Sequence, residues 1–244
     1  MKGLIPDTLR KILGTLVLPS RCLLCGKESG EGYPLCEPCR HSFLTERIED
    51  LSFKSEMPDR CDRCGRPLIS ALKRCIECRE TNALSAIDRV LPLFFYTAEA
   101  QALLTAWKVT GIRGFSAVFA ECLALVLART EGAIAVPVPP RPGKLRDRGW
   151  DQIEDIARLL ESRHGIAVSR CLERRSAVQQ KKLGKLARLT NMRGAIAVKE
   201  KAAVPQTAIV IDDLMTTGAT LEACADALKA AGCGKVYGLT LFFD

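Results

Sequence analysis

The chain has 244 residues, of which 48% are hydrophobic and 26% charged, so it can form a buried core and has the ordinary charge content of a globular protein. Its length suits one medium-sized domain and a small one. The net charge is +8, and residues 141–193 alone carry 14 basic and 6 acidic side chains, so the rest of the chain is neutral in sum. This local excess indicates an anionic ligand or partner for that stretch, although a solvated surface with a basic bias gives the same pattern.

The first 19 residues contain the longest candidate for a membrane or targeting segment. Apolar residues recur there at helical spacing, but Arg10 and Lys11 interrupt the apolar run. A spanning helix needs about 20 mostly apolar residues, and a secretory signal needs an uninterrupted apolar stretch and a cleavage site. We therefore predict an amphipathic helix over residues 1–19 that packs on the protein, no transmembrane segment and a cytoplasmic location. Contact with a membrane surface is the lesser alternative.

Residues 20–85 contain an internal repeat of cysteines. Each half reads C-x2-C-x10-C-x2-C, and the second half follows the first at an offset of 39 residues. Two C-x2-C pairs supply the tetrahedral sulfur set that structural zinc prefers, and the segment has few large apolar residues for a core of its own. The sequence therefore predicts a double zinc ribbon with two structural zinc ions. The eight ligands are Cys22, Cys25, Cys36, Cys39, Cys61, Cys64, Cys75 and Cys78.

The pairing of these cysteines leaves alternatives open. Disulfides would use the same residues, but paired C-x2-C spacing without a secretory signal favours metal. The ligands can divide sequentially, four and four along the chain, or interleave in a cross-brace, and the spacing does not choose between them. The remaining cysteines are predicted to be small buried hydrophobic residues: Cys122, Cys171, Cys224 and Cys233.

From residue 86 onward, longer apolar runs alternate with helical patterns. The runs predict strands over residues 86–96, 133–139, 195–198, 208–211 and 236–243. The helices are predicted over residues 98–109 and 115–129, from Asp151 onward, and over 221–232, where Gly232 is the natural stop. This alternation indicates an α/β domain over residues 86–244, with a mostly parallel sheet flanked by helices. Ligands of such sheets bind beyond the carboxyl ends of the strands.

The stretch IVIDDLMTTGAT, residues 209–220, joins a buried strand to a helix. Asp212 and Asp213 follow the strand, and the residues that lead into the helix are Thr216, Thr217, Gly218, Ala219 and Thr220. The amides at a helix N-terminus suit a phosphate, the glycine lets the backbone approach it, and the hydroxyls add donors. Carboxylates beside such a cradle suit vicinal sugar hydroxyls or a magnesium ion. We predict a ribose-5-phosphate site; an ordinary capped strand–turn–helix connection is the plain alternative.

These twelve residues resemble the phosphoribosyl pyrophosphate motif of type I phosphoribosyltransferases, in which the acidic pair holds the ribose hydroxyls and the TTGAT turn holds the 5-phosphate. Two further segments carry a wider resemblance: VPVPPRPGKLRDRGWDQ (136–152) and QKKLGKLARLTNMRGAI (180–196). With the cysteine-rich N-terminus, residues 20–243 resemble the ComF/GntX-like family of bacterial proteins associated with competence and DNA utilisation. The resemblance implies a type I phosphoribosyltransferase-like fold preceded by a double zinc ribbon.

The resemblance also implies roles for individual residues. Binding of phosphoribosyl pyrophosphate, with Mg²⁺, falls to the acidic pair, the TTGAT turn and four residues of the first loop: Arg141, Lys144, Arg146 and Gln152. The implied catalytic residues are Asp212, Asp213, Arg148 and Arg188. A pyrophosphate leaving group needs cations and Mg²⁺ to stabilise its developing charge. The chain departs from the usual family pattern at Arg141, Asp151 and Ala187, where His, Asn and Glu are usual.

Three functions fit these features. The first is a phosphoribosyltransferase that attaches ribose to an unknown acceptor. The second is a DNA-handling factor whose partners are single-stranded DNA or DNA-uptake proteins. The third is a sensor that binds phosphoribosyl pyrophosphate without turnover. Aromatic residues make up only 5% of the chain and are not interleaved with basic ones, which weakens the second function.

Overall fold

The computed structural model describes residues 21–29, 33–48, 50–55, 57–69, 72–81, 84–141, 149–175 and 195–244. The helix predicted over residues 1–19 lies outside them. The elements in chain order are α2 (Glu37–Ile48), α3 (Ile76–Glu80), β1 (Arg89–Phe95), α4 (Ala98–Lys108), α5 (Gly114–Leu127), β2 (Ile134–Pro137), α7 (Gln152–His164), β3 (Leu172–Arg174), β4 (Ile196–Val198), β5 (Thr207–Met215), α9 (Ala219–Ala230) and β6 (Lys235–Phe243).

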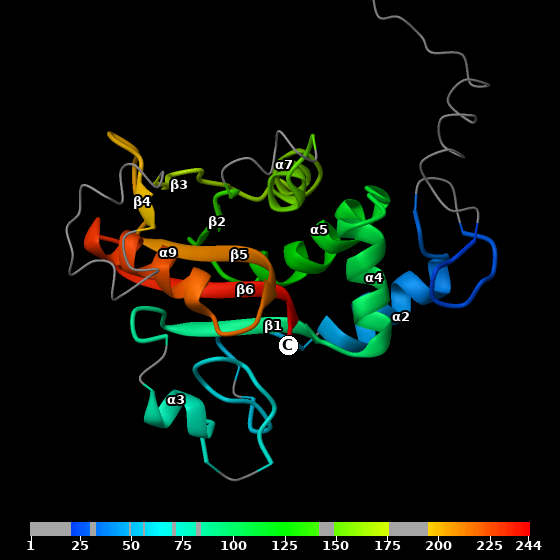
Figure 1. Ribbon diagram of the computed structural model, residues 1–244, viewed down its shortest axis with the longest axis horizontal. Coiled ribbons are helices and arrows are strands. Elements are labelled where there is room, and N and C mark those ends of the chain that lie inside the picture. The colour runs from blue at the N-terminus through cyan, green and yellow to red at the C-terminus, as the bar shows by residue number, and fades with distance from the viewer. Residues whose placement is uncertain are drawn as a thin grey trace, which may run out of the picture.

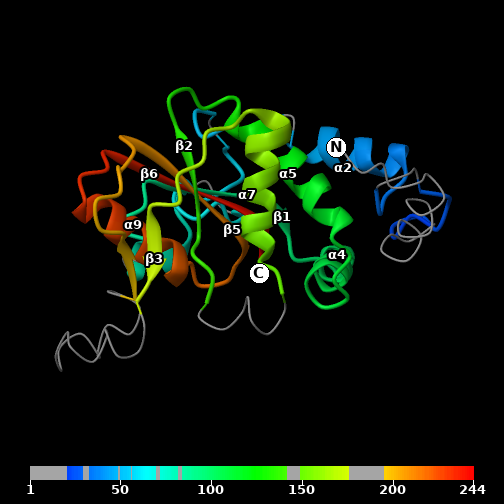
Figure 2. The same cartoon turned by 90° about the horizontal axis from the view of Figure 1, so that it is seen from above.

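A parallel sheet forms the centre of the α/β part (Figure 1). Its strand order is β1-β6-β5-β2, and all three pairings are parallel. Helices flank the sheet: α5 contacts β6, α9 contacts β5 and β6, and α7 lies across β2 and β5 (Figure 2). The predicted α/β class is therefore confirmed, with a cysteine-rich segment that contains two groups of four cysteines before the sheet. The division into units over 20–85 and 86–244 stays a prediction.

The two faces of the sheet follow the alternation of side chains along β5. Ile209 and Ile211 belong to the buried cluster that includes residues of α4, α5 and α7, whereas Ala208 and Val210 belong to the cluster that includes α9. Successive side chains of a strand point to opposite faces, and a central parallel strand is buried on both. By the same alternation, Asp212 lies toward the α9 face and Asp213 toward the α4 face.

The strand that carries the acidic pair is longer than predicted. The sequence predicts its end at residue 211, but β5 continues to Met215 and pairs with β6 as far as Phe243. Aspartate is a poor strand former, yet a full-length partner strand overrides that local preference. On the other side, β2 pairs with β5 only up to Ile211. The acidic pair therefore lies within β5 but beyond the end of β2.

Other predicted elements also need correction. Residues 195–198 were expected to join the mostly parallel sheet, but β4 pairs antiparallel with β3 in a separate two-stranded sheet. The sequence pattern does not predict β3, α2 or α3, because three to five residues show too little periodicity and because the cysteine spacing dominates residues 22–78. The helix predicted from residue 221 begins at Ala219. Within the described ranges, no helix combines the length and apolar character that crossing a bilayer requires.

Candidate functional site

The acidic pair meets a lysine at the carboxyl end of β5. Lys108 Nζ lies 2.7 Å from Asp213 Oδ2, and the two side chains are only 22% and 14% exposed. Asp212 Oδ1 accepts a hydrogen bond of 2.8 Å from the Asp213 amide. Lys108 is the last residue of α4, so the end of this helix brings a cation to the end of the strand. Sequence reasoning missed this lysine, since its position after Trp107 gives no sign of the distant carboxylate.

The two carboxylates have different electrostatic surroundings. Burial and the neighbouring Asp213 raise the pKa of Asp212 to about 7, while Lys108 and Arg174 act in the opposite direction. Arg174 ends β3 and donates from Nε to the carbonyl oxygen of Pro139 at 2.9 Å. Cations thus approach the acidic pair from α4 and from β3. Both the protonated and the ionised form of Asp212 are therefore accessible near neutral pH.

The turn between β5 and α9 has the features of a phosphate cradle. Gly218 precedes α9 with a φ of +75°, a left-handed conformation that favours glycine. A Cβ atom there would lie 2.6 Å from Leu84 Cδ2, so the site also lacks room for a side chain. Thr216 and Thr217 are exposed, and Thr217 Oγ1 accepts a hydrogen bond of 3.4 Å from the Ala219 amide. The exposed hydroxyls and the first amides of α9 can reach one anion.

The predicted pyrophosphate residues are described only in part. Arg141 is exposed, while the structure does not describe Lys144, Arg146, Arg148 and Arg188. Gln152, the first residue of α7, is wholly buried, and neither its Oε1 nor its Nε2 has a hydrogen-bond partner within the described ranges. A buried amide without partners is unfavourable. Its polar atoms therefore need a partner from a ligand or from another part of the chain.

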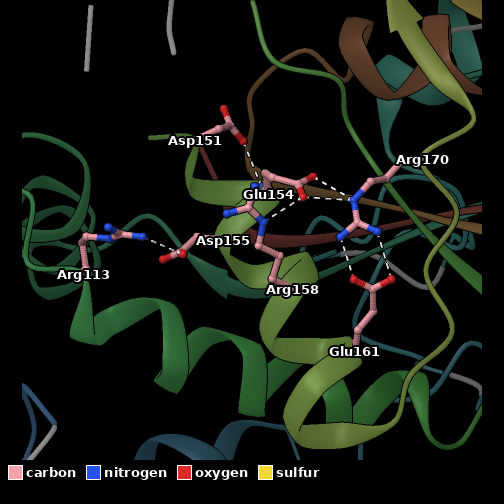
Figure 3. Close-up of polar contacts among 7 residues, drawn as sticks. All are labelled: Arg113, Asp151, Glu154, Asp155, Arg158, Glu161 and Arg170. Atoms are coloured by element: carbon pink, nitrogen blue, oxygen red, sulfur yellow. Dashed lines mark hydrogen bonds and ion pairs between the residues drawn. The ribbon is translucent and has the colours of Figure 1, made fainter. Parts of the chain in front are cut away.

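Ion pairs hold α7, the helix that follows this loop (Figure 3). Asp151 begins the helix, because its Oδ1 accepts a hydrogen bond of 3.0 Å from the Glu154 amide. The ion pairs join Arg113 to Asp155, Arg158 to Glu154, and Arg170 to Glu154 and Glu161. Arg158 and Arg170 belong to the basic stretch 141–193, and so do their partners Glu154 and Glu161, so these pairs leave the net excess of the stretch unchanged. Arg174, at the acidic pair, belongs to the same stretch and approaches the predicted ligand site.

The eight paired cysteines form two groups, each with its sulfur atoms within 4.8 Å of one another. The grouping is sequential: Cys22, Cys25, Cys36 and Cys39 in the first group, and Cys61, Cys64, Cys75 and Cys78 in the second. Sulfur atoms lie 3.6 Å apart in the Cys25–Cys36 pair and 3.8 Å apart in the Cys64–Cys75 pair. Tetrahedral zinc at about 2.3 Å from each sulfur separates the sulfurs by about 3.8 Å, whereas a disulfide brings them to about 2 Å. Both groups are therefore compatible with structural zinc.

The thiols of the second group influence one another. The hydrogen bond from Cys64 lowers the pKa of the Cys61 thiol to about 4, whereas the hydrogen bond to Cys61 and burial raise the pKa of Cys64, and burial raises that of Cys78. All twelve cysteines are free of disulfides. The four single cysteines are buried, as predicted: Cys122, Cys171, Cys224 and Cys233. With four sulfur atoms in each group there is no open ligand position, and the expected role of the metal is structural.

The comparison with known proteins covers nearly the whole chain. No family model matches it. It is 24% identical over 239 residues to "Competence protein ComFC" of Streptococcus pneumoniae (strain ATCC BAA-255 / R6), a match that spans 91% of this chain and 99% of the relative. The resemblance to the ComF/GntX-like family is confirmed. Because the match extends over 91% of the chain, it includes the cysteine-rich segment as well as the parallel sheet and its loops.

Proposed function

We propose that this protein binds phosphoribosyl pyrophosphate with Mg²⁺ at the carboxyl end of β5. The observation that carries the proposal is the order of groups there: an acidic pair beside Lys108, then a glycine-capped helix start with exposed threonines. The 5-phosphate binds the residues Thr216, Thr217, Gly218, Ala219 and Thr220. The ribose hydroxyls donate to Asp212 and Asp213. The pyrophosphate meets Arg141, Lys144, Arg146 and Gln152, and the unpartnered buried amide of Gln152 supports a ligand on that side.

The donor set at the acidic pair suits Mg²⁺. Magnesium prefers oxygen ligands and is usually held by one or two carboxylates together with substrate phosphates. Asp212, with its pKa of about 7, can release its proton to such a cation near neutral pH. Lys108 already balances the charge of Asp213. A metal ion at Asp212 would balance the second carboxylate, so the two would not repel each other. When bound, the metal neutralises charge on the pyrophosphate.

If the ligand is turned over, the bond between the ribose anomeric carbon and the pyrophosphate oxygen breaks and a bond to the acceptor forms. Arg148 and Arg188 then stabilise the charge of the departing pyrophosphate. Binding without turnover requires the same acidic pair and the same turn, residues 216–220, which we call the phosphate turn. Release of pyrophosphate in the presence of candidate acceptors separates the two outcomes.

Titration calorimetry with phosphoribosyl pyrophosphate and MgCl₂ tests the binding proposal. Each lost hydrogen bond to a charged group weakens binding by about 10-fold or more, so Asp212→Asn combined with Asp213→Asn is expected to reduce affinity at least about 100-fold. The matched control is Asp155→Asn. It removes the carboxylate of a residue on α7 that forms an ion pair with Arg113. The control is expected to bind like the wild type. A double variant with unchanged affinity contradicts the assignment of the site.

We also propose a role in competence, with single-stranded DNA or DNA-uptake proteins as partners. The support is the match with a protein named for competence and the positive balance of residues 141–193. Contact with DNA phosphates predicts an affinity that falls steeply with salt. Fluorescence anisotropy with a labelled oligonucleotide at 50 and 200 mM salt measures it. An affinity independent of salt, or no binding at the lower concentration, contradicts direct DNA contact.

A further inference from the structure

A short segment connects the second cysteine group to the sheet. We call residues 84–86 the connector; they follow α3 and precede β1. Leu84 is 4% exposed and has a φ of +59°, a left-handed conformation that a leucine seldom adopts. Such a conformation persists only where the surroundings determine it. The contacts of the connector are therefore specific ones.

The first of these contacts is with the phosphate turn. Leu84 Cδ2, Cγ and Cδ1 would lie 2.6, 3.4 and 3.5 Å from a Cβ atom on Gly218. The leucine side chain thus occupies the space that any side chain at Gly218 would need. Leu84 and Gly218 can pack this closely because Gly218 has no side chain. Both residues have left-handed backbone conformations. Leu84 packs directly on Gly218, the residue that precedes α9.

The second contact is with the first turn of α9. Glu222 Oε1 accepts hydrogen bonds from Ser85 Oγ at 2.8 Å and from the Ala86 amide at 3.0 Å. An acidic side chain in the first turn would otherwise compete with an anion for the positive end of the helix. Here the carboxylate faces two donors of the connector instead. The connector therefore has two contacts here: Leu84 packs on Gly218, and Ser85 and Ala86 donate to Glu222 of α9.

The second cysteine group lies against the same turn. Two cysteines of the group, Cys64 and Cys78, line one small pocket together with Leu84 of the connector and with Thr216 and Thr217 of the turn. The group is also fastened to β1, since the Val90 amide donates to the Arg63 carbonyl at 2.7 Å and Arg63 donates to the Ile87 carbonyl. The second cysteine group, the connector and the phosphate turn thus border one pocket, and Cys64, Leu84 and Met215 belong to one buried cluster. The first cysteine group packs elsewhere, against α5 through α2.

We infer that Leu84, Ser85 and Glu222 are positioning residues for the phosphate turn, and that metal in the second cysteine group holds them in place. Metal binding at this group and phosphate binding at residues 216–220 are then coupled, and the coupling is reciprocal by thermodynamic linkage. The first cysteine group takes no part in it. The identity of the ligand rests on the proposed function. The contacts of Leu84, Ser85 and Glu222 do not depend on it.

The test compares zinc release from the two groups with and without ligand. The full chain is loaded with zinc and exposed to an excess of a colorimetric chelator, with phosphoribosyl pyrophosphate and Mg²⁺ or with buffer. The variants Cys25→Ser and Cys64→Ser, at matching positions of the repeat, assign the two release phases to their groups. Ligand is expected to slow release from the second group about 5-fold and to leave the first unchanged. Equal slowing of both phases, or of neither while calorimetry shows binding, overturns the inference.

Variants of the connector separate positioning from general stability. Ser85→Ala and Glu222→Ala are expected to weaken ligand binding about 3- to 10-fold and to remove the effect of ligand on zinc release. Glu222→Gln keeps an acceptor oxygen for the connector and is expected to retain both. If only the negative charge of Glu222 mattered, Glu222→Gln and Glu222→Ala would behave alike, which contradicts a positioning role.

A last measurement distinguishes failure of this inference from failure of the proposed function. If phosphoribosyl pyrophosphate does not bind the wild type, the proposed function is wrong, and the contacts are tested by hydrogen exchange. The amides of residues 218–223 are expected to exchange at least 5-fold faster in Cys64→Ser than in Cys25→Ser. Equal exchange in the two variants contradicts the link between the second group and the turn.

Discussion

The two cysteine groups share one local structure and have different neighbours. In each, the first cysteine amide donates to a carbonyl five residues later, Cys22 to Lys27 at 2.6 Å and Cys61 to Arg66 at 2.7 Å. Gly26 and Gly65 have φ angles of +71° and +73°. The surroundings differ: the first group lies beyond α2, whereas the second lies below β1 with α3 (Figure 1).

The same repeat can therefore form the same arrangement of four cysteines twice and still pack against different parts of the protein. Cys64 is buried in the cluster that contains Met215 and Phe243, beside the phosphate turn, while its counterpart Cys25 is exposed. The hydrogen bonds within the repeat come from local sequence, so they recur. The packing comes from residues far along the chain, so it does not. Matched substitutions at equivalent positions can therefore separate the two contributions.

The largest expected difference is between Cys64→Ser and Cys25→Ser. Both remove a metal ligand, but only the first also places a hydroxyl in the buried core. We expect Cys64→Ser to lower the free energy of unfolding of the α/β part by about 3 kcal/mol, and Cys25→Ser by about 1 kcal/mol or less. Urea unfolding followed by tryptophan fluorescence reports on this part, because Trp107 is buried between α4 and α5 and contacts Phe119. Equal losses would show that the two groups support the core alike.

The glycines of the repeat give the next largest difference. Alanine at either position loses the ease with which glycine adopts a positive φ, at about 1 kcal/mol. A Cβ atom on Gly26 meets nothing within 4 Å, whereas on Gly65 it would lie 2.3 Å from Pro92 Cδ and 2.8 Å from the Val90 carbonyl oxygen. We expect Gly26→Ala to cost about 1 kcal/mol and Gly65→Ala about 2–4 kcal/mol, from the added overlap with β1. The same urea experiment measures both.

The third difference concerns Asp212, whose buried charge is expected to lower the stability of the protein in the absence of ligand. Asp212 has a pKa of about 7 when folded and about 4 when unfolded, so its neutral form stabilises the protein below pH 4 and that contribution is lost as pH rises through 7. Asp212→Asn removes the titration and keeps an oxygen for the Asp213 amide. Without ligand, we expect the variant to gain about 1–2 kcal/mol over the wild type between pH 5 and 8, allowing for solvent screening. A difference independent of pH contradicts the raised pKa.

Much of this arrangement could be predicted from the sequence, and the rest follows from contacts between distant residues. The cysteine spacing and the stretch 209–220 are local patterns, so the sequence alone predicts a chemistry for each. The ends of β5 could not be, because pairing with β6 decides them. Lys108 and Leu84 are ordinary residues of their own segments, and only the fold brings them to Asp213 and Gly218. Local sequence therefore predicts candidate ligand-binding groups, but it does not predict the distant residues that contact them.

The smallest expected difference concerns the basic residue that follows each glycine. Arg66 pairs with Glu77 at 2.9 Å, and its guanidinium carbon lies 5.3 Å from the centre of the Phe243 ring, at the end of β6. Lys27 is exposed. An exposed ion pair and a cation–π contact each contribute at most about 1 kcal/mol, so Arg66→Ala is expected to cost about 0.5–1 kcal/mol and Lys27→Ala less than about 0.3 kcal/mol. Since salt screens the ion pair but not the ring contact, repeating the unfolding at 1 M NaCl should leave about half of the Arg66 effect. Complete loss at high salt would mean that the ion pair with Glu77 accounts for the whole effect and that the ring contact with Phe243 of β6 contributes nothing.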